Sequence, residues 1–171
     1  MSHLESLIAE YLEWQGYLIR RNLKVGRRAK GGWEMELDVV GYHPQLNKII
    51  HYEPSIDAIG WPAREARYKK KFQLARKYMF TEVFSWLASS TQLEQIAVFY
   101  DHPKGRDTIA DGRLISIDEL VAEIRTKVIA SGPMISKTSP PDEKLPPAPD
   151  TTMVLTSSSI AQARKKSVSS R

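Results

Sequence analysis

The hydrophobic positions in the first part of the chain follow one helical pattern and then three strand-like patterns. Apolar residues recur at helical spacing over residues 3–15, where Ser2 suits the N-cap position. Residues 17–25, 33–42 and 48–53 are predicted strands, and the second becomes continuously apolar, as an inner strand does. A basic loop with the sequence GRRAKGG precedes the second strand, and the turn HPQLN precedes the third.

The second part of the chain predicts one long helix, a fourth strand and a further helix. Residues 61–87 form the long helix, and one of its faces is predicted to be core: Tyr68, Phe72, Ala75, Met79, Val83 and Trp86. Residues 95–101 predict a strand, and residues 114–130 begin extended and then become a helix. Ser116 and Glu119 fit a capping box at that helix. The pattern therefore predicts an α/β fold in the order α-β-β-β-α-β-α, with a mixed central sheet flanked by helices.

The composition divides the chain of 171 residues into two parts. Residues 1–130 are predicted to form one compact domain. Residues 131–171 are rich in proline, serine and threonine, which predicts a flexible tail with a basic tip at Arg164, Lys165 and Lys166. A short helix near the end of this tail is an alternative for part of it.

The residue types exclude several classes of site and of location. The chain has no cysteine, so disulfides, thiolate metal sites and cysteine nucleophiles are excluded. No apolar run approaches the length of a membrane span, and the opening SHLESLIAEYLEWQG carries acidic residues where a signal peptide would be apolar. We therefore expect a soluble cytoplasmic protein without a membrane partner.

The positive charge of the chain gathers in two clusters. The formal net charge is +5 and the pI is about 9.4, which favours a polyanionic partner. The first cluster contains Arg20, Arg21, Lys24, Arg27, Arg28 and Lys30. The second contains Arg64, Arg67, Lys69, Lys70, Lys71, Arg76 and Lys77. Each cluster alone fits a solvated face, but together they flank an acidic strand pair, which predicts a surface for a phosphate backbone.

Two acidic residues interrupt the apolar strands of this pair. Asp38 and Glu53 lie on either side of the turn, within a residue or two of opposite positions. Adjacent strands are about 5 Å apart, so one carboxylate on each strand can reach the same ion. Hard cations such as Mg²⁺ or Mn²⁺ prefer oxygen ligands. The spacing is thus compatible with a metal site, and the alternative is two acids at a sheet edge paired with nearby arginines.

Three segments resemble the PD-(D/E)XK nuclease superfamily, whose restriction-endonuclease-like fold includes Holliday-junction resolvases. ESLIAEYLEWQGYLIRRN is similar to a resolvase-like opening, ELDVVGY to the strand with the family aspartate, and HYEPS to the (D/E)-X-K strand. The resemblance covers residues 3 to about 128, and the order of the predicted elements agrees with it. It implies a restriction-endonuclease-like core, duplex or branched DNA as substrate, and a possible homodimer.

The resemblance also assigns metal ligands. Asp38 and Glu53 would be ligands, and the carbonyl of Pro54 would be a third. Glu5 would be the catalytic acid of the first helix and borders its buried face, although an ordinary first-turn acid would also lie there. Asp57 is either a further ligand or a cap-like residue before the long helix, and we favour the cap.

One family position departs from the pattern. Ser55 stands where the family has its lysine; a serine hydroxyl orients water but supplies no positive charge. Some members of the superfamily supply the basic group from the following helix, where Lys71 or Arg64 fits by its angular position. Pro54 removes a backbone donor and predicts a strand end or bulge. His51 is predicted to face away from the acids as a structural residue.

These features predict a divalent-metal-dependent DNA nuclease that is structure-specific or nonspecific. The predicted catalytic residues are Glu5, Asp38, Glu53, Ser55 and Lys71. The predicted nucleic-acid contacts are Arg20, Arg21, Lys24, Arg27, Arg28, Lys30, Arg64, Arg67 and Lys71, and Trp33 and Trp61 are candidates for stacking on bases. Because the motif lysine is replaced, the alternative is a catalytically inactive nucleic-acid-binding module on the same fold. A third possibility is an assembly subunit that docks on an acidic protein.

Overall fold

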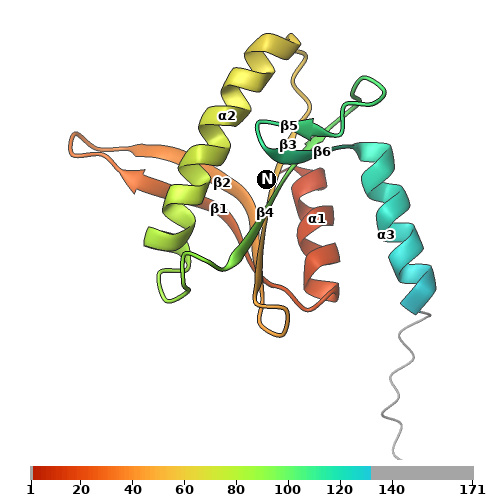
Figure 1. Ribbon diagram of the computed structural model, residues 1–171, viewed down its shortest axis with the longest axis horizontal. Coiled ribbons are helices and arrows are strands. Elements are labelled where there is room, and N and C mark those ends of the chain that lie inside the picture. Colours follow the sequence, from red (N-terminus) through yellow and green to blue (C-terminus); the bar gives the residue numbers. More distant parts are fainter. Residues whose placement is uncertain (1, 132–171) are drawn as a thin grey trace, which may run out of the picture. The chain divides into compact units, whose positions relative to one another are not determined.

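The computed structural model describes residues 2–131, which form an α/β fold with three α-helices and one six-stranded mixed sheet (Figure 1). The elements are α1 (His3–Trp14), β1 (Leu18–Arg27), β2 (Trp33–His43), β3 (Lys48–Ser55), α2 (Trp61–Tyr78), η1 (Met79–Val83), β4 (Gln92–Phe99), β5 (Thr108–Ile109), β6 (Gly112–Ser116) and α3 (Ile117–Ser131). Within the described residues, no helix combines the length and apolar character needed to cross a membrane. The predicted tail lies outside them, apart from Ser131.

The order of the elements confirms the predicted α/β fold with a mixed sheet. The strand order is β1-β2-β3-β4-β6-β5. β1, β2 and β3 form an antiparallel meander, whereas β4 lies parallel to β3 and to β6, because α2 carries the chain back before β4 begins. The short antiparallel pair β5–β6 adds a hairpin to the predicted order. The predicted capping box of α3 is confirmed by hydrogen bonds in both directions between Ser116 and Glu119, at 2.7 and 3.1 Å.

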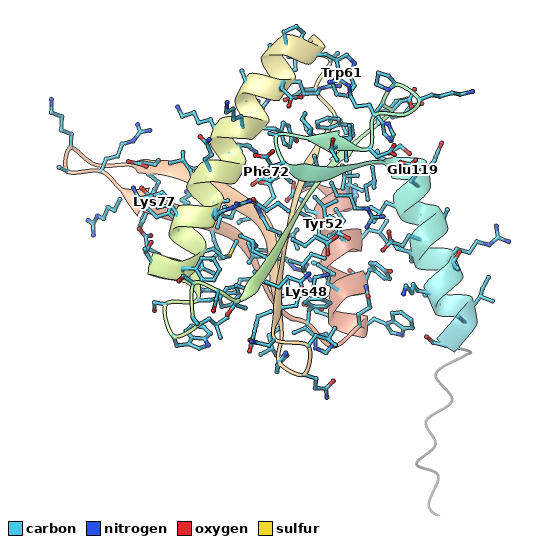
Figure 2. All side chains as sticks on the ribbon, viewed as in Figure 1. Lys48, Tyr52, Trp61, Phe72, Lys77 and Glu119 are labelled. Atoms are coloured by element: carbon cyan, nitrogen blue, oxygen red, sulfur yellow. The ribbon has the colours of Figure 1, made fainter. Side chains whose placement is uncertain are left out.

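Helices cover the sheet on both faces. α1 and α3 pack on one face, where Ile8, Leu12 and Leu120 contact Tyr52 of β3. α2 packs on the other face. Figure 2 shows Phe72 of α2 and Tyr52 of β3 on opposite sides of the central strands. The strands in the middle of the sheet are therefore buried on both faces, which explains their nearly continuous apolar sequences.

The long helix differs from its prediction at its C-terminal end. The α-helix ends at Tyr78, and one π-helical turn follows, closed by a hydrogen bond from Phe84 N to Met79 O at 2.8 Å. A π-turn contains one residue more than an α-turn, so it rotates the following side chains around the axis. Phe84 is buried as a result, and the prediction that Trp86 belongs to the core is wrong, because 69% of it is exposed.

The β1–β2 hairpin extends beyond the rest of the sheet. β1 and β2 pair from Leu18–Tyr42 to Arg27–Trp33, whereas β2 pairs with β3 only from Val39 to His43. We call residues 24–36 the hairpin arm; Figure 1 shows it projecting past α2. The arm and the strand ends at its base place the residues described next.

Candidate metal centre

The two predicted carboxylates lie on neighbouring strands at opposite positions. Val39 of β2 pairs with Tyr52 of β3 in antiparallel register. Continuing this register by one residue places Asp38 opposite Glu53, so their side chains project to the same face of the sheet. β3 has no partner in β2 beyond this point, which leaves the carboxylates at the edge of the paired region.

A lysine of α2 joins these carboxylates. The Lys71 ammonium donates to Glu53 Oε2 and lies 4.0 Å from Asp38 Oδ2. Of the two cations predicted to replace the missing lysine, Lys71 is therefore the one that reaches the acids. The Arg64 guanidinium instead donates to the carbonyl of Asp57 and packs over the ring of Phe99, 4.4 Å from its centroid.

The Glu53 side chain is fully buried, and each of its oxygens has a partner. His51 Nε2 lies 3.0 Å from Glu53 Oε1, and the Tyr68 hydroxyl donates to the Glu53 carbonyl at 3.1 Å. Both Glu53 and His51 are 0% exposed. The prediction that His51 faces away from the acids is wrong, because residues two apart in a strand share a face. Burying a carboxylate is costly without such partners.

A further side chain orients His51 from β4. Gln95 Nε2 donates to Phe72 O at 3.0 Å and lies 3.5 Å from His51 Nδ1. Arg76 donates to Gln95 Oε1 at 3.3 Å. An amide N–H directed at Nδ1 favours the tautomer that carries its proton on Nε2, which then donates to Glu53. Gln95 and Tyr68 thus hold the site together from other elements, and the sequence pattern predicted neither of them to belong to it.

The two carboxyl groups have opposite pKa shifts. Burial raises the pKa of Asp38 to about 8, and the charge of Glu53 adds to this shift, although Lys71 opposes it. Burial also tends to raise the pKa of Glu53, but hydrogen bonds and charge from His51 and Lys71 outweigh it and hold the pKa at about 2. Without a further cation, Glu53 is therefore ionised and Asp38 retains a proton at neutral pH.

These groups fit a hard divalent cation with few protein ligands. Asp38 and Glu53 already share one cationic group, the Lys71 ammonium, so an ion near that position has both carboxylates within reach. Among residues 2–131, no cluster of three or more histidine, aspartate or glutamate side chains is arranged to hold a metal. Mg²⁺ is commonly held by one or two carboxylates, with water and substrate phosphate completing its shell. A pair of carboxylates is therefore compatible with Mg²⁺ as a ligand set.

Glu5 lies near this pair but is held by its own partners. The Ser2 hydroxyl accepts from Glu5 N at 3.2 Å, which caps α1, and it also donates to Glu5 Oε1 at 2.9 Å. Asn22 of β1 donates to Glu5 Oε2 at 3.4 Å and adopts a φ of +50°, a conformation that asparagine tolerates. Glu5 thus fixes the start of α1 beside Asp38.

Two cavities meet at the candidate centre, and Asp38, Arg67 and Lys71 line both of them. The larger, of about 580 Å³, is bounded by residues 2–5 of the N-terminal segment and residues 54–57 after Glu53. The smaller, of about 310 Å³, lies between α2 and residues 34–36 of the hairpin arm. An extended ligand therefore has space on both sides of the carboxylates.

The segment after Glu53 agrees with one prediction, a strand end near Pro54, and differs from another, the role of Asp57. β3 continues through Pro54, which pairs with Val98 of β4, and ends at Ser55; a proline is tolerated here because β2 no longer pairs with this segment. Ser55 Oγ accepts from Asp57 N at 3.3 Å. The preferred cap-like role of Asp57 is wrong: Gly60 is the N-cap of α2, and the Asp57 carboxylate pairs with Arg67.

The predicted nucleic-acid contacts divide into two groups. Arg20 donates to Val83 O at 3.3 Å, and Arg21 pairs with Glu13 at 3.2 Å. With Arg64, Arg67 and Lys71, these side chains already have partners within the chain. The other four, which are exposed and without an ion pair among residues 2–131, are Lys24, Arg27, Arg28 and Lys30.

The two tryptophans predicted to stack on bases also differ from each other in their surroundings. Trp61 packs against Phe99, between the guanidinium groups of Arg64 and Arg106, which lie 5.0 and 4.7 Å from its ring centroid. Trp33 is 43% exposed and lies on the hairpin arm. Of the two, Trp33 is therefore the better placed to contact a ligand.

No family model, curated protein or solved structure matched the chain. The functional interpretation therefore depends on the geometry of the carboxylate–lysine centre. Its oxygens offer ligands to a hard cation, its ammonium can donate to water or to an anion, and its two cavities provide room for a substrate on either side.

Proposed function

We propose that the protein is a divalent-metal-dependent DNA nuclease with a restriction-endonuclease-like core of the PD-(D/E)XK type. The observation that carries the proposal is the convergence of Asp38, Glu53 and Lys71, which come from β2, β3 and α2, where the two cavities meet. The order of the elements α1, β1–β3, α2, β4 along the chain supports it, because this order agrees with the core that the sequence resemblance implies.

The chemistry divides between a bound cation and the residues of the chain. When bound, Mg²⁺ or Mn²⁺ activates water and stabilises the charge that develops on the phosphate. Asp38 and Glu53 would hold the ion, with the Pro54 carbonyl as a further ligand. His51 and Lys71 keep Glu53 ionised, and the Tyr68 hydroxyl fixes the main chain there by donating to the Glu53 carbonyl. Lys71 would then direct its N–H groups at the attacking water or at a phosphate oxygen.

The position of Lys71 also offers a replacement for the lysine that the family pattern has at position 55. In the family pattern the basic group follows the second acid on the same strand, where this chain has Ser55. Lys71 reaches Glu53 from α2 instead, through a direct contact with the carboxylate. This contact favours relocation of the basic group over its loss, and therefore favours an active enzyme.

The same contact also supports the second candidate function, an inactive DNA-binding module. Glu53 is buried and satisfied by Lys71 and His51, so the chain stabilises its own carboxylate without any metal. A protein of this kind would bind DNA equally well with and without divalent cations. The two candidates are separated by cleavage and by the dependence of binding on metal.

The test is cleavage of labelled single-stranded, duplex and branched DNA with Mg²⁺ or Mn²⁺. The variants are Asp38→Ala and Glu53→Ala, and Asp118→Ala serves as a control because it removes an exposed acid from α3. We expect metal-dependent cleavage by the wild type and the control, and its loss in both site variants. Wild-type protein that binds DNA but never cuts it would support the inactive module. Cleavage that survives both site substitutions would refute the assigned centre.

A further inference from the structure

The base of the hairpin arm is fixed to α2 and to the π-turn that follows it. Gly26 N donates to both carboxylate oxygens of Glu82, at 3.3 and 3.2 Å, and the Tyr78 hydroxyl donates to Glu34 Oε2 at 2.5 Å. Val25 is buried against the same helix. A two-stranded hairpin alone is marginally stable in water, so these contacts are what hold the arm in a defined direction.

The tip of the arm carries positive charge without internal compensation. Arg27, Arg28 and Lys30 are exposed, and none of them has an ion pair with residues 2–131. Some cations elsewhere on the sheet have carboxylate partners: Arg21 pairs with Glu13, Lys48 with Glu94, and Arg113 with Glu123. Exposed cations without an ion pair among residues 2–131 also occur on the helices, but the tip brings three of them together within four residues of a projecting turn. Like charges on a narrow projection repel one another, so a polyanion is the partner that this charge distribution fits.

The shape of the tip suits a nucleic-acid backbone. Gly31 and Gly32 have positive φ values of +90° and +80°, and no atom lies within 4 Å of the positions that their Cβ atoms would occupy. The main chain is therefore bare at the tip and can approach a surface closely. A two-stranded ribbon fits a groove of duplex DNA.

The arm also forms part of the candidate centre. The smaller cavity is lined on one side by residues 34–36 of the arm and on the other by Lys70 and Leu74 of α2, and it reaches Asp38. A duplex that is held by the tip would therefore have its backbone beside the carboxylates.

We propose that the hairpin arm is a duplex-DNA-binding element in which Arg27, Arg28 and Lys30 contact phosphates. The link to cleavage rests on the proposed nuclease function, whereas the binding itself does not. The proposal also narrows the predicted surface: Arg20, Arg21 and Arg64 are not contacts, because their guanidinium groups are engaged within the chain.

The test compares two triple variants of the full chain with the same change in net charge. One is Arg27→Ala/Arg28→Ala/Lys30→Ala; the control, Lys104→Ala/Arg125→Ala/Lys127→Ala, removes three exposed cations from the β4–β5 loop and α3. Affinity for duplex DNA is measured with EDTA present, at salt concentrations from about 50 to 200 mM. For the arm variant we expect at least a tenfold loss of affinity and a salt slope shallower by about 2–3. The control should lose less than about threefold, since its cations lie outside the arm.

Two further measurements make the result specific. Arg27→Lys/Arg28→Lys keeps the charge, so it should retain most of the affinity, and equal melting temperatures would show that the tip variants are folded. Equal losses for the arm variant and the control would overturn the proposal, and an equal loss on single-stranded DNA would overturn its choice of duplex. If the arm variant loses binding while Asp38→Ala still cuts DNA, the arm stands and the assigned centre falls.

Discussion

The candidate centre and the tip of the hairpin arm are joined by β2, yet they treat charge in opposite ways. Glu53 is buried, and Lys71, His51 and Tyr68 contact its carboxylate or its carbonyl. The tip residues 27–33 are exposed, and their cations have no ion pair among residues 2–131. Among the described residues, the chain thus supplies partners for the charge of the centre but not for the charge of the tip.

Because of this difference, substitutions in the two regions are expected to affect different properties of the protein. Removing one partner of a buried charge leaves the other uncompensated and costs several kcal/mol, whereas exposed charges contribute little to folding. Substitutions at the centre are therefore expected to change both the free energy of unfolding and the chemistry. Substitutions at the tip should change only affinity for a polyanion.

The largest expected effect is on cleavage, from removal of the lysine at the centre. If the proposed nuclease function holds, Lys71→Ala should lower the single-turnover cleavage rate by about 10²- to 10³-fold, because it removes the ammonium that contacts Glu53 and that we propose to act on the attacking water or the phosphate. Lys69→Ala is the matched control on α2, since Lys69 is exposed and lines neither cavity of the centre. The proposed role of Lys71 would be refuted by equal rates for the two variants, with circular dichroism confirming that both are folded.

The next effect is on stability and concerns the buried histidine. His51→Leu should lower the free energy of unfolding by about 2–4 kcal/mol, because it leaves Glu53 Oε1 buried without a donor. His51→Gln can keep an N–H group near the same position, so it should lower the free energy of unfolding by distinctly less. Urea denaturation measures both, and the tip variant should change stability by less than about 0.5 kcal/mol. A tip variant as destabilised as His51→Leu would break the distinction between the two regions.

A substitution at Gly26, at the base of the hairpin arm, should lower the free energy of unfolding by less than His51→Leu does. Gly26 has a φ of +71°, and a Cβ there would lie 2.5 Å from the Tyr78 hydroxyl oxygen. Gly26→Ala should therefore cost about 1–3 kcal/mol in thermal or chemical unfolding. Gly31→Ala has a similar φ but open space, so about 1 kcal/mol is expected from conformation alone. Equal costs would mean that the contact with Tyr78 does not fix the arm.

The last effect on stability depends on pH and concerns Asp38. Because the pKa of Asp38 is raised to about 8 from an ordinary 3.8, the folded chain keeps a proton that the unfolded chain has lost between these values. Stability of the wild type therefore falls as pH rises through this window. Asp38→Asn removes the dependence, so with EDTA present its stability relative to the wild type should rise by roughly 3 kcal/mol from pH 5 to pH 8. An advantage that shrinks towards pH 8 would contradict the assigned shift.

The fold was largely predictable because the apolar periodicity of the sequence is strong. The helix at residues 3–14 and the strands β1 to β3 lie within a few residues of their predicted bounds. The exposure of Trp86 was not predictable, because the π-turn that exposes it depends on packing between η1 and the β1–β2 hairpin.

The centre was predictable where local geometry sufficed. The turn length placed Asp38 opposite Glu53, and the angular position on the helix selected Lys71 as one of two candidates. His51 was assigned to the wrong face although the two-residue period of a strand indicates its true position. Gln95 comes from β4, so its contact with His51 depends on a strand pairing that no local pattern reveals.

The most direct test of the central claim is the position of manganese in crystals of the protein soaked with Mn²⁺, located by anomalous scattering. We expect one ion bound by the carboxylates of Asp38 and Glu53, and no ion there in crystals of Asp38→Ala grown under the same conditions. Full occupancy of Mn²⁺ elsewhere, with the Lys71–Glu53 contact intact and no ion between the carboxylates, would contradict it.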